Sequence, residues 1–562
     1  MAHVVTQPCC NDAACVSVCP VNCIHPAPHE PGYGTAEMLY IDPVSCIDCG
    51  ACVEVCPVSA IVADIDLTDE TAPYEEINAA FYSNRTSEDA NVVRAQTKKV
   101  DSDEKLRPLK VAIVGSGPAA CYTAEELLLR RDLAVEVNMF EQLPTPWGLV
   151  RYGVAPDHQG TKAVAGLFQR TAGRRGMEMF LNVTVGKHVT HEELLESHDA
   201  VVYAIGASGS RRLDIPGEEL PGSHSATEFV AWYNGHPDFA DSVFDLSADR
   251  AVVIGNGNVA LDVARLLVSE PQALAKTDMA THAVDRLAGS NIKEVVVMGR
   301  RGPAQAAYTT PELLALSQSS SFDVHVDMDE SELDAYSRAA TEGNDPIATV
   351  KLGILRKLAS SAPSPGKKRI VLRYLASPLE VLGDDHVEGL RIAHNELVST
   401  QDGRSQVRPT GVEEDIECGL VLRSIGYRGV PTGPLPIEPV SGTIANHGGR
   451  VTSESGACLT GVYVAGWIKR GPTGVIGTNK KCAKDTVEKI IEDHRAGRLK
   501  APVRAQENLR QLISERQPDY LNFAGAKSID AHERSLGRER GAPRIKLIDL
   551  NEMLRVAERP NV

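Results

Sequence analysis

Four closely spaced cysteines are the strongest chemical signal in the sequence. They form the run Cys46-x2-Cys49-x2-Cys52-x3-Cys56-Pro57. In a run of this spacing the first three thiolates hold one [4Fe–4S] cluster, and the fourth ligates a second cluster. Zinc sites usually pair two distant CxxC units, and disulfides are rare in chains without an export signal. The spacing therefore predicts iron–sulfur clusters and one-electron chemistry.

A broken copy of this run lies closer to the N-terminus. It reads Cys9-x2-Asp12-x2-Cys15-x3-Cys19-Pro20, with an aspartate in place of the second cysteine. The usual exchange of ligands assigns one [4Fe–4S] cluster to Cys46, Cys49, Cys52 and Cys19, and the other cluster to Cys9, Cys15 and Cys56. Carboxylate is a poorer cluster ligand than thiolate. We expect the second cluster to be [3Fe–4S], or a labile [4Fe–4S] cluster with Asp12 as fourth ligand; a solvated surface aspartate is the alternative.

Two cysteines of this region are left without a place in either run. Cys10 is adjacent to Cys9 and could replace it as a ligand, and the spacing leaves that choice open. Cys23 follows Cys19-Pro20 by three residues and is expected to pack near a cluster as a small apolar thiol.

A first dinucleotide site is predicted by a strand, a glycine turn and a helix in that order. Residues 110–114 are apolar and β-branched, residues 122–131 have a helical pattern, and a second strand ends at Glu141. In such a turn the first glycine permits the bend, the second admits a pyrophosphate, and a small residue allows close helix packing. The acid suits a ribose and favours FAD or NAD over NADP. The turn residues are Gly115, Gly117, Ala119 and Ala120.

A second site repeats this pattern with one informative change. Residues 250–254 form the predicted strand and residues 261–268 the helix, but the next strand, 293–298, is followed by Arg300 and Arg301 instead of an acid. Guanidinium groups match a 2′-phosphate, so the arginine pair predicts NADP(H). A basic pair on the surface is the alternative. The turn residues are Gly255, Asn256, Gly257, Asn258, Val259 and Ala260.

These sites must be positioned by a larger α/β framework. A Gly- and Pro-rich loop spans residues 147–158, and a Gly/Thr loop at 471–479 precedes a predicted helix at 480–491. Such a loop at a helix N-terminus presents N–H groups to an anion or to the polar edge of a flavin. Because this second loop lies far from Gly115, we predict a split FAD domain with the NADP domain inserted. Only a flavin takes a hydride and releases single electrons, so the predicted order is NADPH, FAD, cluster.

Composition restricts the partners and the compartment. The chain has 562 residues and a net charge of −17, while residues 1–84 hold 12 acidic residues and no Lys or Arg. This balance argues against nucleic acid or an anionic membrane as the main partner. No apolar run is long enough for a membrane span, and no secretory signal is evident, so we expect a cytoplasmic protein. The acidic N-terminal part is expected to dock on a basic face of the FAD side or on a basic external partner.

Residues 1–60 resemble a bacterial seven-iron-type ferredoxin, and residues 107–560 resemble the adrenodoxin reductase family. The marks of the latter are the stretch ending at His158, the Gly255 turn, the arginine pair and the loop from Trp467 to Asn479. Together they are similar to bacterial ferredoxin/ferredoxin–NADP reductase fusions. The resemblance implies flavin contacts at Leu149, Trp467, Gly474, Val475 and Ile476; NADP contacts at 256–260, Arg300, Arg301 and Glu312; and a proton relay at His158. A second acid that the family often carries three residues after Glu312 is Ala315 here.

The resemblance also implies a fold class and a division into domains. The expected fold is an α+β ferredoxin-like domain followed by an α/β flavoprotein with two Rossmann-like, glutathione reductase-type domains. The predicted boundaries are a ferredoxin domain at 1–62, a linker at 63–107, an FAD domain at 108–208 and 425–562, and an NADP domain at 209–424. The expected acceptor is a ferredoxin or a downstream redox enzyme such as a cytochrome P450. The alternative is an electron-input module of the glutamate synthase small-subunit type.

Overall fold

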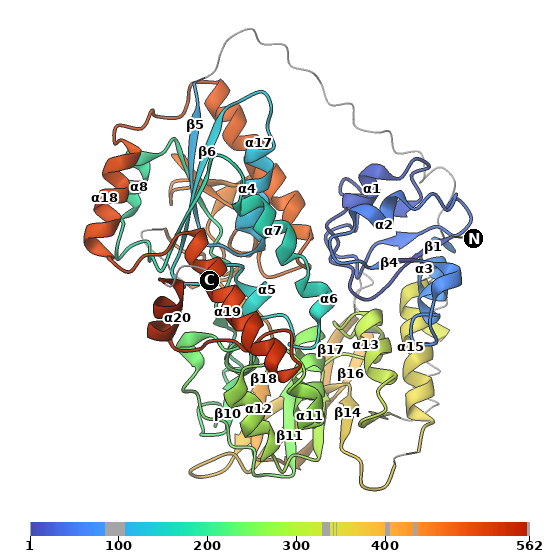
Figure 1. The fold of residues 1–562 in the computed structure, drawn as a ribbon. Coiled ribbons are helices and arrows are strands. Elements are labelled where there is room, and N and C mark those ends of the chain that lie inside the picture. The colour runs from blue at the N-terminus through green and yellow to red at the C-terminus, as the bar shows by residue number, and fades with distance from the viewer. Residues whose placement is uncertain are drawn as a thin grey trace.

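The computed structural model describes residues 2–84, 107–328 and 338–558, apart from 341, 344, 363, 400–404 and 431–434. Three units are visible (Figure 1): a head formed by residues 2–84, an upper unit built on a seven-stranded sheet, and a lower unit built on a six-stranded sheet. Residues 85–106 of the predicted linker lie outside the described part of the chain.

The head is small and is built around its cysteine runs. Its two five-residue helices each begin just before a cysteine of a run and pack against each other. The antiparallel pairs are β1 with β4 and β2 with β3. The bounds are β1 His3–Val5, α1 Ala14–Val18, β2 Ile24–His25, β3 Tyr40–Ile41, α2 Ala51–Val55 and β4 Ile61–Ala63, followed by the 3-10 turn η1 Asp64–Asp66.

Helix α3, Pro73–Tyr82, lies within the predicted linker and packs into the head. The Asn78 side chain lies inside the head, where its Oδ1 accepts from the Ile41 N–H at 2.9 Å and its Nδ2 donates to the Val5 carbonyl at 2.9 Å. The Tyr82 hydroxyl donates to the Tyr40 carbonyl at 2.7 Å. The predicted boundary at residue 62 divides elements that pack together, so we propose that the head extends to about residue 84.

The upper unit contains the sheet β20-β21-β22-β8-β5-β6-β7. Its core strands are parallel, which requires crossover connections and buries the sheet on both faces. Helices α4 and α17 pack together beside it. The strands are β5 Leu109–Val114, β6 Val135–Glu141, β7 Met177–Leu181, β8 Ala200–Tyr203, β20 Asn446–His447, β21 Arg450–Thr452 and β22 Cys458–Val464. The helices are α4 Pro118–Leu128, α5 Leu149–Tyr152, α6 Gln159–Lys162, α7 Ala165–Ala172, α8 His191–Ser197, α16 Trp467–Arg470 and α17 Thr478–Arg495.

The lower unit contains the parallel sheet β10-β18-β11-β12-β14-β13 and a separate antiparallel sheet β15-β16-β17. The strands are β10 Ser223–Ser225, β11 Arg250–Ile254, β12 Glu294–Met298, β13 Asp323–Asp327, β14 Arg369–Arg373, β15 Ala376–Leu382, β16 Gly389–Ser399, β17 Ser405–Glu417 and β18 Leu420–Arg423. The helices are α9 Ala226–Tyr233, α10 Asn258–Val268, α11 Pro271–Leu274, α12 Thr281–Ala288, α13 Thr310–Ser317 and α15 Pro346–Ala359, with 3-10 turns η2 Pro237–Phe239 and η3 Pro303–Gln305.

The two connections between the body units lie side by side. Strand β9, Gly209–Ser210, pairs with β19, Tyr427–Arg428, so the chain enters and leaves the lower unit at one place. This arrangement agrees with an inserted second domain. After α17 the chain continues into α18 Gln506–Arg516, α19 Phe523–Arg540 and α20 Leu550–Ala557. Among the described residues, no helix is long and apolar enough to span a membrane.

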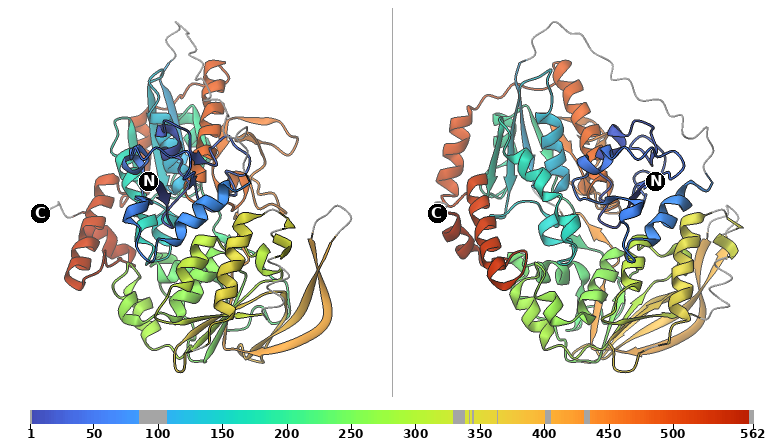
Figure 2. Two further views of the ribbon diagram at one scale, coloured as in Figure 1. Left: turned by 90° about the vertical axis from the view of Figure 1, so that its right-hand side faces the viewer. Right: turned by 45° about the vertical axis from the view of Figure 1, so that its right-hand side comes forward.

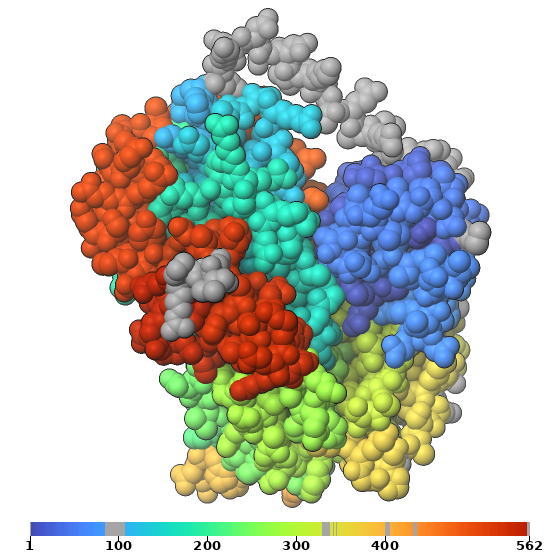
Figure 3. Space-filling model, in the orientation of Figure 1, coloured from blue at the N-terminus to red at the C-terminus, as the bar shows by residue number. Residues whose placement is uncertain are grey.

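The head lies against both body units rather than apart from them (Figures 1 and 2). In the space-filling view it abuts the upper unit on one side and the lower unit below (Figure 3). The apolar core of the head includes Leu314 of α13, and Ile347, Val350 and Ile354 of α15 pack against it. On the other side, Cys10, Val58 and Ala60 share a buried cluster with Tyr122 and Phe168 of the upper unit.

Candidate functional site

The first glycine turn lies between β5 and α4. A Cβ at Gly115 would overlap the Ala204 carbonyl, whereas a Cβ at Gly117 would meet nothing within 4 Å. Space beside the second glycine is what a pyrophosphate needs. Helix α4 begins at Pro118, four residues earlier than the sequence predicts, because proline is well suited to a first helical position.

Glu141 lies at the end of β6, beside this turn. Its Oε2 accepts from the Ser116 N–H at 3.1 Å and from the Ser116 hydroxyl at 2.6 Å. Burial raises the pKa of Glu141, and hydrogen bonds from Ser116 and Leu143 oppose that shift. The predicted ribose-binding acid is therefore held next to the glycine turn.

Three distant segments meet at the N-terminus of α4. The Trp147 N–H donates to the Ser116 carbonyl at 3.2 Å, which holds Gly148 and Leu149 beside Gly117. From the C-terminal part of the chain, Gly466 lies against Ala119, one residue before Trp467. Of the residues predicted to contact FAD, the structure thus brings together Gly117, Ala119, Ala120, Glu141, Leu149 and Trp467.

The second glycine turn is braced by two asparagines, one through its side chain and one through its main-chain carbonyl. Asn258 Oδ1 accepts from the Thr309 N–H at 2.8 Å, and the Asn256 carbonyl accepts from the Tyr308 N–H at 2.8 Å. Gly257, like Gly117, faces open space. Helix α10 begins at Asn258, three residues before the predicted start, so Val259 and Ala260 are already helical.

Arg300 and Arg301 follow β12 at the same edge of the lower sheet. Their main-chain carbonyls are fixed, since the Arg300 carbonyl accepts from Asn395 Nδ2 at 3.2 Å and the Arg301 carbonyl from the Leu375 N–H at 3.0 Å. Both side chains are exposed. Among the described residues neither guanidinium has an ion-pair partner, which leaves both available to a phosphate.

His158 and Glu312 come from different units and lie close together. His158 Nε2 is 3.9 Å from Glu312 Oε2 and 4.0 Å from Asp262 Oδ1, and it is 3.2 Å from a guanidinium nitrogen of Arg265. Arg265 also contacts Asp262 at 2.5 Å. Burial raises the pKa of Asp262 and lowers that of Arg265 to about 10. This cluster can hold a proton between an imidazole and two carboxylates.

Sequence reasoning missed Asp262 and Arg265. Both lie on α10, which begins at Asn258 of the second glycine turn. The signal was present: positions 258, 262 and 265 follow the i, i+4, i+7 spacing of one helix face. That face points at His158 because α10 begins where the two body units meet.

The outer cysteine group faces solvent. Cys19, Cys46, Cys49 and Cys52 line one small cavity, together with Cys23. Cys23 Sγ lies 3.4 Å from Cys19 Sγ, as expected of a thiol packed near a cluster. Cys49 is exposed, and apolar side chains surround this group: Val21, Val44, Ile47 and Val53 are 39%, 91%, 58% and 38% exposed.

The inner cysteine group lies toward the body. The charges of Asp12 and Cys56 act on both Cys9 and Cys15, which places these four residues together. Burial raises the pKa of Cys9 and Cys52 to about 11. The feature that fits metal clusters is the donor set itself: cysteines gathered in two groups, one of them around a single small cavity, can bind metal as thiolates.

Asp12 and Cys10 are both buried at the boundary with the upper unit. Asp12 is 7% exposed; its Oδ2 lies 3.5 Å from Lys480 Nζ and its Oδ1 accepts from the Ala14 N–H at 3.2 Å. The alternative of a solvated surface aspartate is therefore wrong. Cys10 is 3% exposed and belongs to the buried cluster with Tyr122, whereas Cys9 also packs in the core of the head.

The inner group meets the Gly/Thr loop of the upper unit. The Gly477 N–H donates to the Cys10 carbonyl at 2.6 Å, and a Cβ at Gly477 would overlap the backbone of residues 10–12. Gly474, next to Val475 and Ile476, lies against the Gly34 carbonyl. Trp467 Nε1 donates to the Thr473 carbonyl at 3.2 Å. The loop predicted to contact the flavin is thus also the surface on which the head is docked.

Two ion pairs also join the head to the body. Glu37 accepts from Lys351 Nζ at 3.1 Å and from the Thr310 N–H at 2.7 Å, and Asp12 pairs with Lys480 as described. The acidic head therefore meets lysines of both body units. This agrees with the predicted docking on a basic face, although one of the two lysines lies in the lower unit.

Comparison with known protein families matches two parts of the chain. Residues 9–60 match the 4Fe-4S dicluster domain, and residues 109–297 match the pyridine nucleotide-disulphide oxidoreductase family.

The comparisons also find long relatives. A probable ferredoxin/ferredoxin–NADP reductase of Mycobacterium bovis is 50% identical over 99% of this chain and 95% of its own length. The NADPH-ferredoxin reductase FprA of Mycobacterium tuberculosis is 47% identical over 80% of this chain and 99% of its own length. The solved structure of that FprA in complex with NADPH gives a TM-score of 0.76, with 47% identity, and covers 80% of this chain and 100% of the other.

Proposed function

Since the chain belongs to the family of ferredoxin/ferredoxin–NADP reductases, we propose a route by which it moves electrons from NADPH through FAD to its own head and on to an external acceptor. The first part of this function is an NADPH:ferredoxin oxidoreductase activity, carried by a dicluster head and a flavoprotein body. The observation that supports the route is the backbone contact between Gly477 and Cys10.

Bound FAD accepts a hydride and releases electrons singly, and iron–sulfur clusters carry one electron each. The residues proposed to hold FAD converge at the α4 N-terminus, where Gly117 leaves space and Glu141 is fixed. Those proposed to hold NADP(H) are Gly255 to Ala260, with Arg300 and Arg301 for the 2′-phosphate. Open space beside both second glycines fits these two dinucleotides.

His158 is proposed to hold a proton at Nε2, where the two nucleotide units meet. Glu312 and Asp262 lie within about 4 Å of that nitrogen, and a guanidinium nitrogen of Arg265 lies 3.2 Å from it. The family often carries a second acid at the position of Ala315, and we assign the role of that acid to Asp262 in this chain. Arg265 fixes the Asp262 carboxylate by a 2.5 Å contact.

The two cysteine groups have different neighbours, and this sets the proposed order of transfer. The inner site of Cys9, Cys15 and Cys56 lies beside the loop 474–477, so it is proposed to receive electrons first. The outer site of Cys19, Cys46, Cys49 and Cys52 lies at the surface and is proposed to deliver them. The proposal uses Cys9 as the ligand, because Cys9 also packs against the head core that contains Cys15, whereas Cys10 does not.

We assign a [3Fe–4S] cluster to the inner site. Both Asp12 oxygens already have partners, Lys480 and the Ala14 N–H, so the carboxylate is employed in docking. Three thiolates then remain for the inner cluster and four for the outer [4Fe–4S] cluster.

The exposed apolar residues around Cys49 form the proposed contact for the external acceptor. Val44 and Ile47 are 91% and 58% exposed; Asp48 follows Ile47 in sequence, and Glu54 follows Val53. A ferredoxin or a redox enzyme such as a cytochrome P450, with a basic rim around an apolar patch, fits this surface. Ile47→Asp is expected to slow delivery to that acceptor, whereas Val243→Asp, at an exposed position of the lower unit, leaves it unchanged.

The experiment is an anaerobic NADPH titration of the full chain, followed by flavin absorbance and low-temperature EPR. In the wild type, flavin bleaching and cluster signals change together. Loss of the inner site in Cys15→Ser leaves flavin reduction intact and stops reduction of the outer cluster. Loss of the outer site in Cys49→Ser leaves the EPR signal of the inner cluster and stops only the reduction of the external acceptor. The control is Cys458→Ser, at an exposed cysteine of the body. Normal reduction of the outer cluster in Cys15→Ser would contradict the order.

The alternative of an electron-input module for a larger complex has less support. A relative that matches 99% of the chain is named a reductase. The cysteine spacing of the head and the match to a dicluster domain also favour the reductase.

A further inference from the structure

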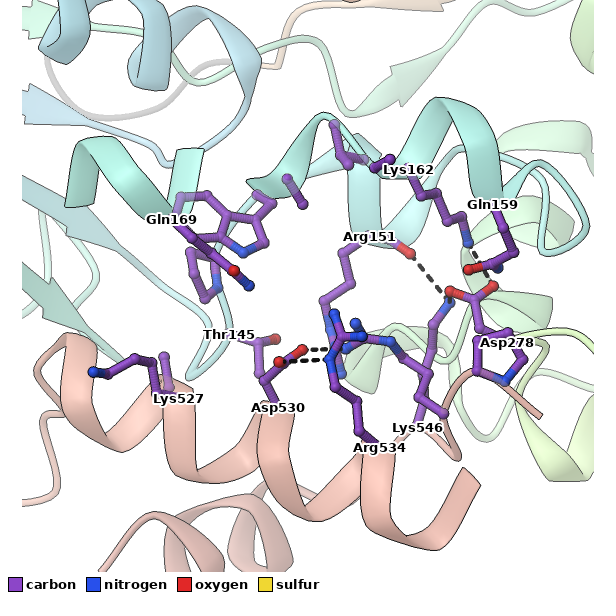
Figure 4. A pocket seen from close by; sticks show the side chains of 18 of the residues that line it. Thr145, Arg151, Gln159, Lys162, Gln169, Asp278, Lys527, Asp530, Arg534 and Lys546 are labelled. Carbon is purple, nitrogen blue, oxygen red and sulfur yellow. Dashed lines mark hydrogen bonds and ion pairs between the residues drawn. The ribbon is translucent and has the colours of Figure 1, made fainter. Parts of the chain in front are cut away.

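A cavity of about 260 Å³ lies between the segment from α5 to α7 and helix α19, on the upper unit (Figure 4). None of the residues proposed to hold FAD, NADP(H) or a cluster lines it. The cavity also receives Asp278 from the lower unit and Lys546 from the segment that follows α19. Three parts of the chain that are distant in sequence therefore form its wall.

The wall carries more positive than negative charge. Its two lining carboxylates are Asp278 and Asp530, and Glu533 lies behind them against Arg151. The lining cations number six: Arg151, Lys162, Lys527, Arg534, Arg544 and Lys546. Three carboxylates against six cations leave a surplus of three positive charges around one cavity.

Part of this surplus is fully buried. Lys162 Nζ lies 2.6 Å from Asp278 Oδ1 and Lys546 Nζ lies 3.5 Å from Asp278 Oδ2, so one carboxylate faces two ammonium groups. The Lys546 side chain is 0% exposed and the Lys162 side chain 9%. Burial lowers the pKa of both lysines, which reflects the cost of an uncompensated charge away from water.

A buried guanidinium also has an unused donor. Arg151 makes two hydrogen bonds to Glu533, at 2.6 and 2.8 Å, but its buried Nε has no hydrogen-bond partner among the described residues. Arg151 is 8% exposed and lines the cavity. An unpaired buried donor costs about 1–3 kcal/mol unless another group accepts from it.

The opposite wall is apolar and aromatic. Trp147 and Phe523 line it, with their ring centroids 6.1 Å apart. Lys527 Nζ lies 5.7 Å from the Phe523 ring centroid and, among the described residues, has no carboxylate partner. Gln169 lies at the edge of the same cavity (Figure 4). A flat apolar group fits against the cavity side of these rings, and a negative group fits beside the lining cations.

We propose that this cavity binds a small aromatic anion, a ring bearing a carboxylate or a phosphate. The ring packs against Trp147 and Phe523, and the anionic group lies beside Lys527 and the other accessible lining cations, Arg534 and Arg544. Binding compensates the surplus positive charge around the cavity. The site stands independently of the nucleotide and cluster sites, and its failure would leave the proposed electron route unaffected.

The position of the cavity gives binding a structural effect. Lys162 and Arg151 belong to the upper unit, Asp278 and Asn234 to the lower unit, and Lys546 to the C-terminal segment. Lys546 Nζ donates to Asn234 Oδ1 at 2.9 Å and to the Arg151 carbonyl at 3.2 Å, so the network joins all three. A ligand that binds this network stabilises the observed arrangement of the two units.

The test measures binding to the full-length holoprotein with saturating NADP⁺, which fills the site at Arg300 and Arg301. Benzoate and phenyl phosphate are titrated by calorimetry and by thermal unfolding. Saturable binding and a concentration-dependent rise in Tm are expected. Benzyl alcohol, which has the ring without the charge, and inorganic phosphate, which has the charge without the ring, are expected to bind at least tenfold more weakly.

Two variants locate the site without removing a buried charge. Lys527→Ala is expected to weaken the aromatic anions about tenfold, as expected for one lost charge contact. Gln169→Trp fills the cavity edge and is expected to abolish binding, while Lys500→Ala, an exposed lysine elsewhere on the upper unit, changes nothing. Equal binding of benzyl alcohol or phosphate, no saturable binding of either aromatic anion, or full binding to Gln169→Trp would overturn the proposal.

Discussion

Glu37 is the residue that most directly tests whether the head is docked as described. Its carboxylate joins the head to the lower unit through Lys351 at 3.1 Å and the Thr310 N–H at 2.7 Å. The Glu37 and Lys351 side chains are 19% and 7% exposed. Glu37→Gln keeps the shape and an acceptor for Thr310 but removes the charge.

The expected loss follows from burial. Removing one partner of a fully buried ion pair costs about 3–5 kcal/mol. Glu37 is partly hydrated, and Lys351 keeps the carbonyls of Tyr308 and Ala306 at 2.9 and 3.4 Å, so the remaining charge is not isolated. We therefore expect about 2 kcal/mol, which corresponds to about a thirtyfold decrease in the docking equilibrium constant.

Hydrogen exchange at Gly477 measures that constant directly. Its N–H donates to the Cys10 carbonyl of the head at 2.6 Å, so it exchanges only when the head leaves or the upper unit unfolds. Exchange of a peptide covering the loop 474–480 is expected to be about thirtyfold faster in Glu37→Gln, whatever the starting protection. Peptides from β5, in the core of the upper unit, report unfolding and are expected not to change.

A matched control is Glu76→Gln, an exposed acid on the same head that has no hydrogen bond or ion pair to the body among the described residues. It is expected to leave Gly477 protection unchanged. Unchanged protection in Glu37→Gln, or an equal change in both variants, would show that the head is not held where the structure places it. NADPH reduction of the flavin is expected to keep its rate in both variants, because the charge lies outside the nucleotide turns.

Three further predictions concern single residues. Arg301→Ala removes a charge-assisted contact worth about 1.5–3 kcal/mol, so steady-state kinetics should show a KM for NADPH raised about ten- to hundredfold, with KM for NADH little changed; equal changes for both would contradict a 2′-phosphate role. Asp12→Cys supplies a fourth thiolate, so EPR should lose a [3Fe–4S] signal and gain a second [4Fe–4S] signal, while Asp12→Asn keeps the first; an unchanged cluster type in Asp12→Cys refutes the assignment. Burial lowers the pKa of His198 from 6.5 to about 4, and its Nδ1 and Nε2 lie 2.8 and 2.9 Å from Leu194 O and Asn138 Nδ2. As the pH falls, the unfolded chain therefore binds the extra proton first. The free energy of unfolding falls as pH drops from about 6.5 to 4, by up to about 3 kcal/mol. Tm measured over this range should fall less in His198→Gln, and an equal fall in both proteins excludes His198 as the cause.

The local parts of the site were predictable from the sequence. Gly115, Glu141, Gly255 and Arg300 lie where strand, turn and strand follow each other within a few dozen residues, so their spacing alone restricts their position. The helix starts were less well predicted. Both helices begin directly after the second glycine of their turn, at Pro118 and at Asn258, so the glycine itself is the N-cap. The boundary of the head was less predictable, because the role of Asn78 depends on strands more than 30 residues away.

The contacts between units could not be predicted. Asp262 meets His158 across more than 100 residues, and Lys546 meets Asp278 across more than 260. No local pattern distinguishes such a lysine or aspartate from one on the surface, because only the packing of the units removes water from them. The burial of Cys10 could not be predicted either. Cys9 and Cys10 are adjacent cysteines, yet only Cys9 packs against the core of the head.

The contact at Gly477 also has a consequence for sequence divergence and for protein engineering. It joins main chain to main chain, and a side chain at position 477 would overlap residues 10–12. Mutations that exchange surface side chains can therefore accumulate on either partner without changing how closely the two approach. An engineer who wishes to graft a foreign electron carrier onto this body has to reproduce a backbone path as well as the charge pairs. A transplanted loop with the conformation of residues 9–12 would fit where a carrier of matching charge but different backbone would not.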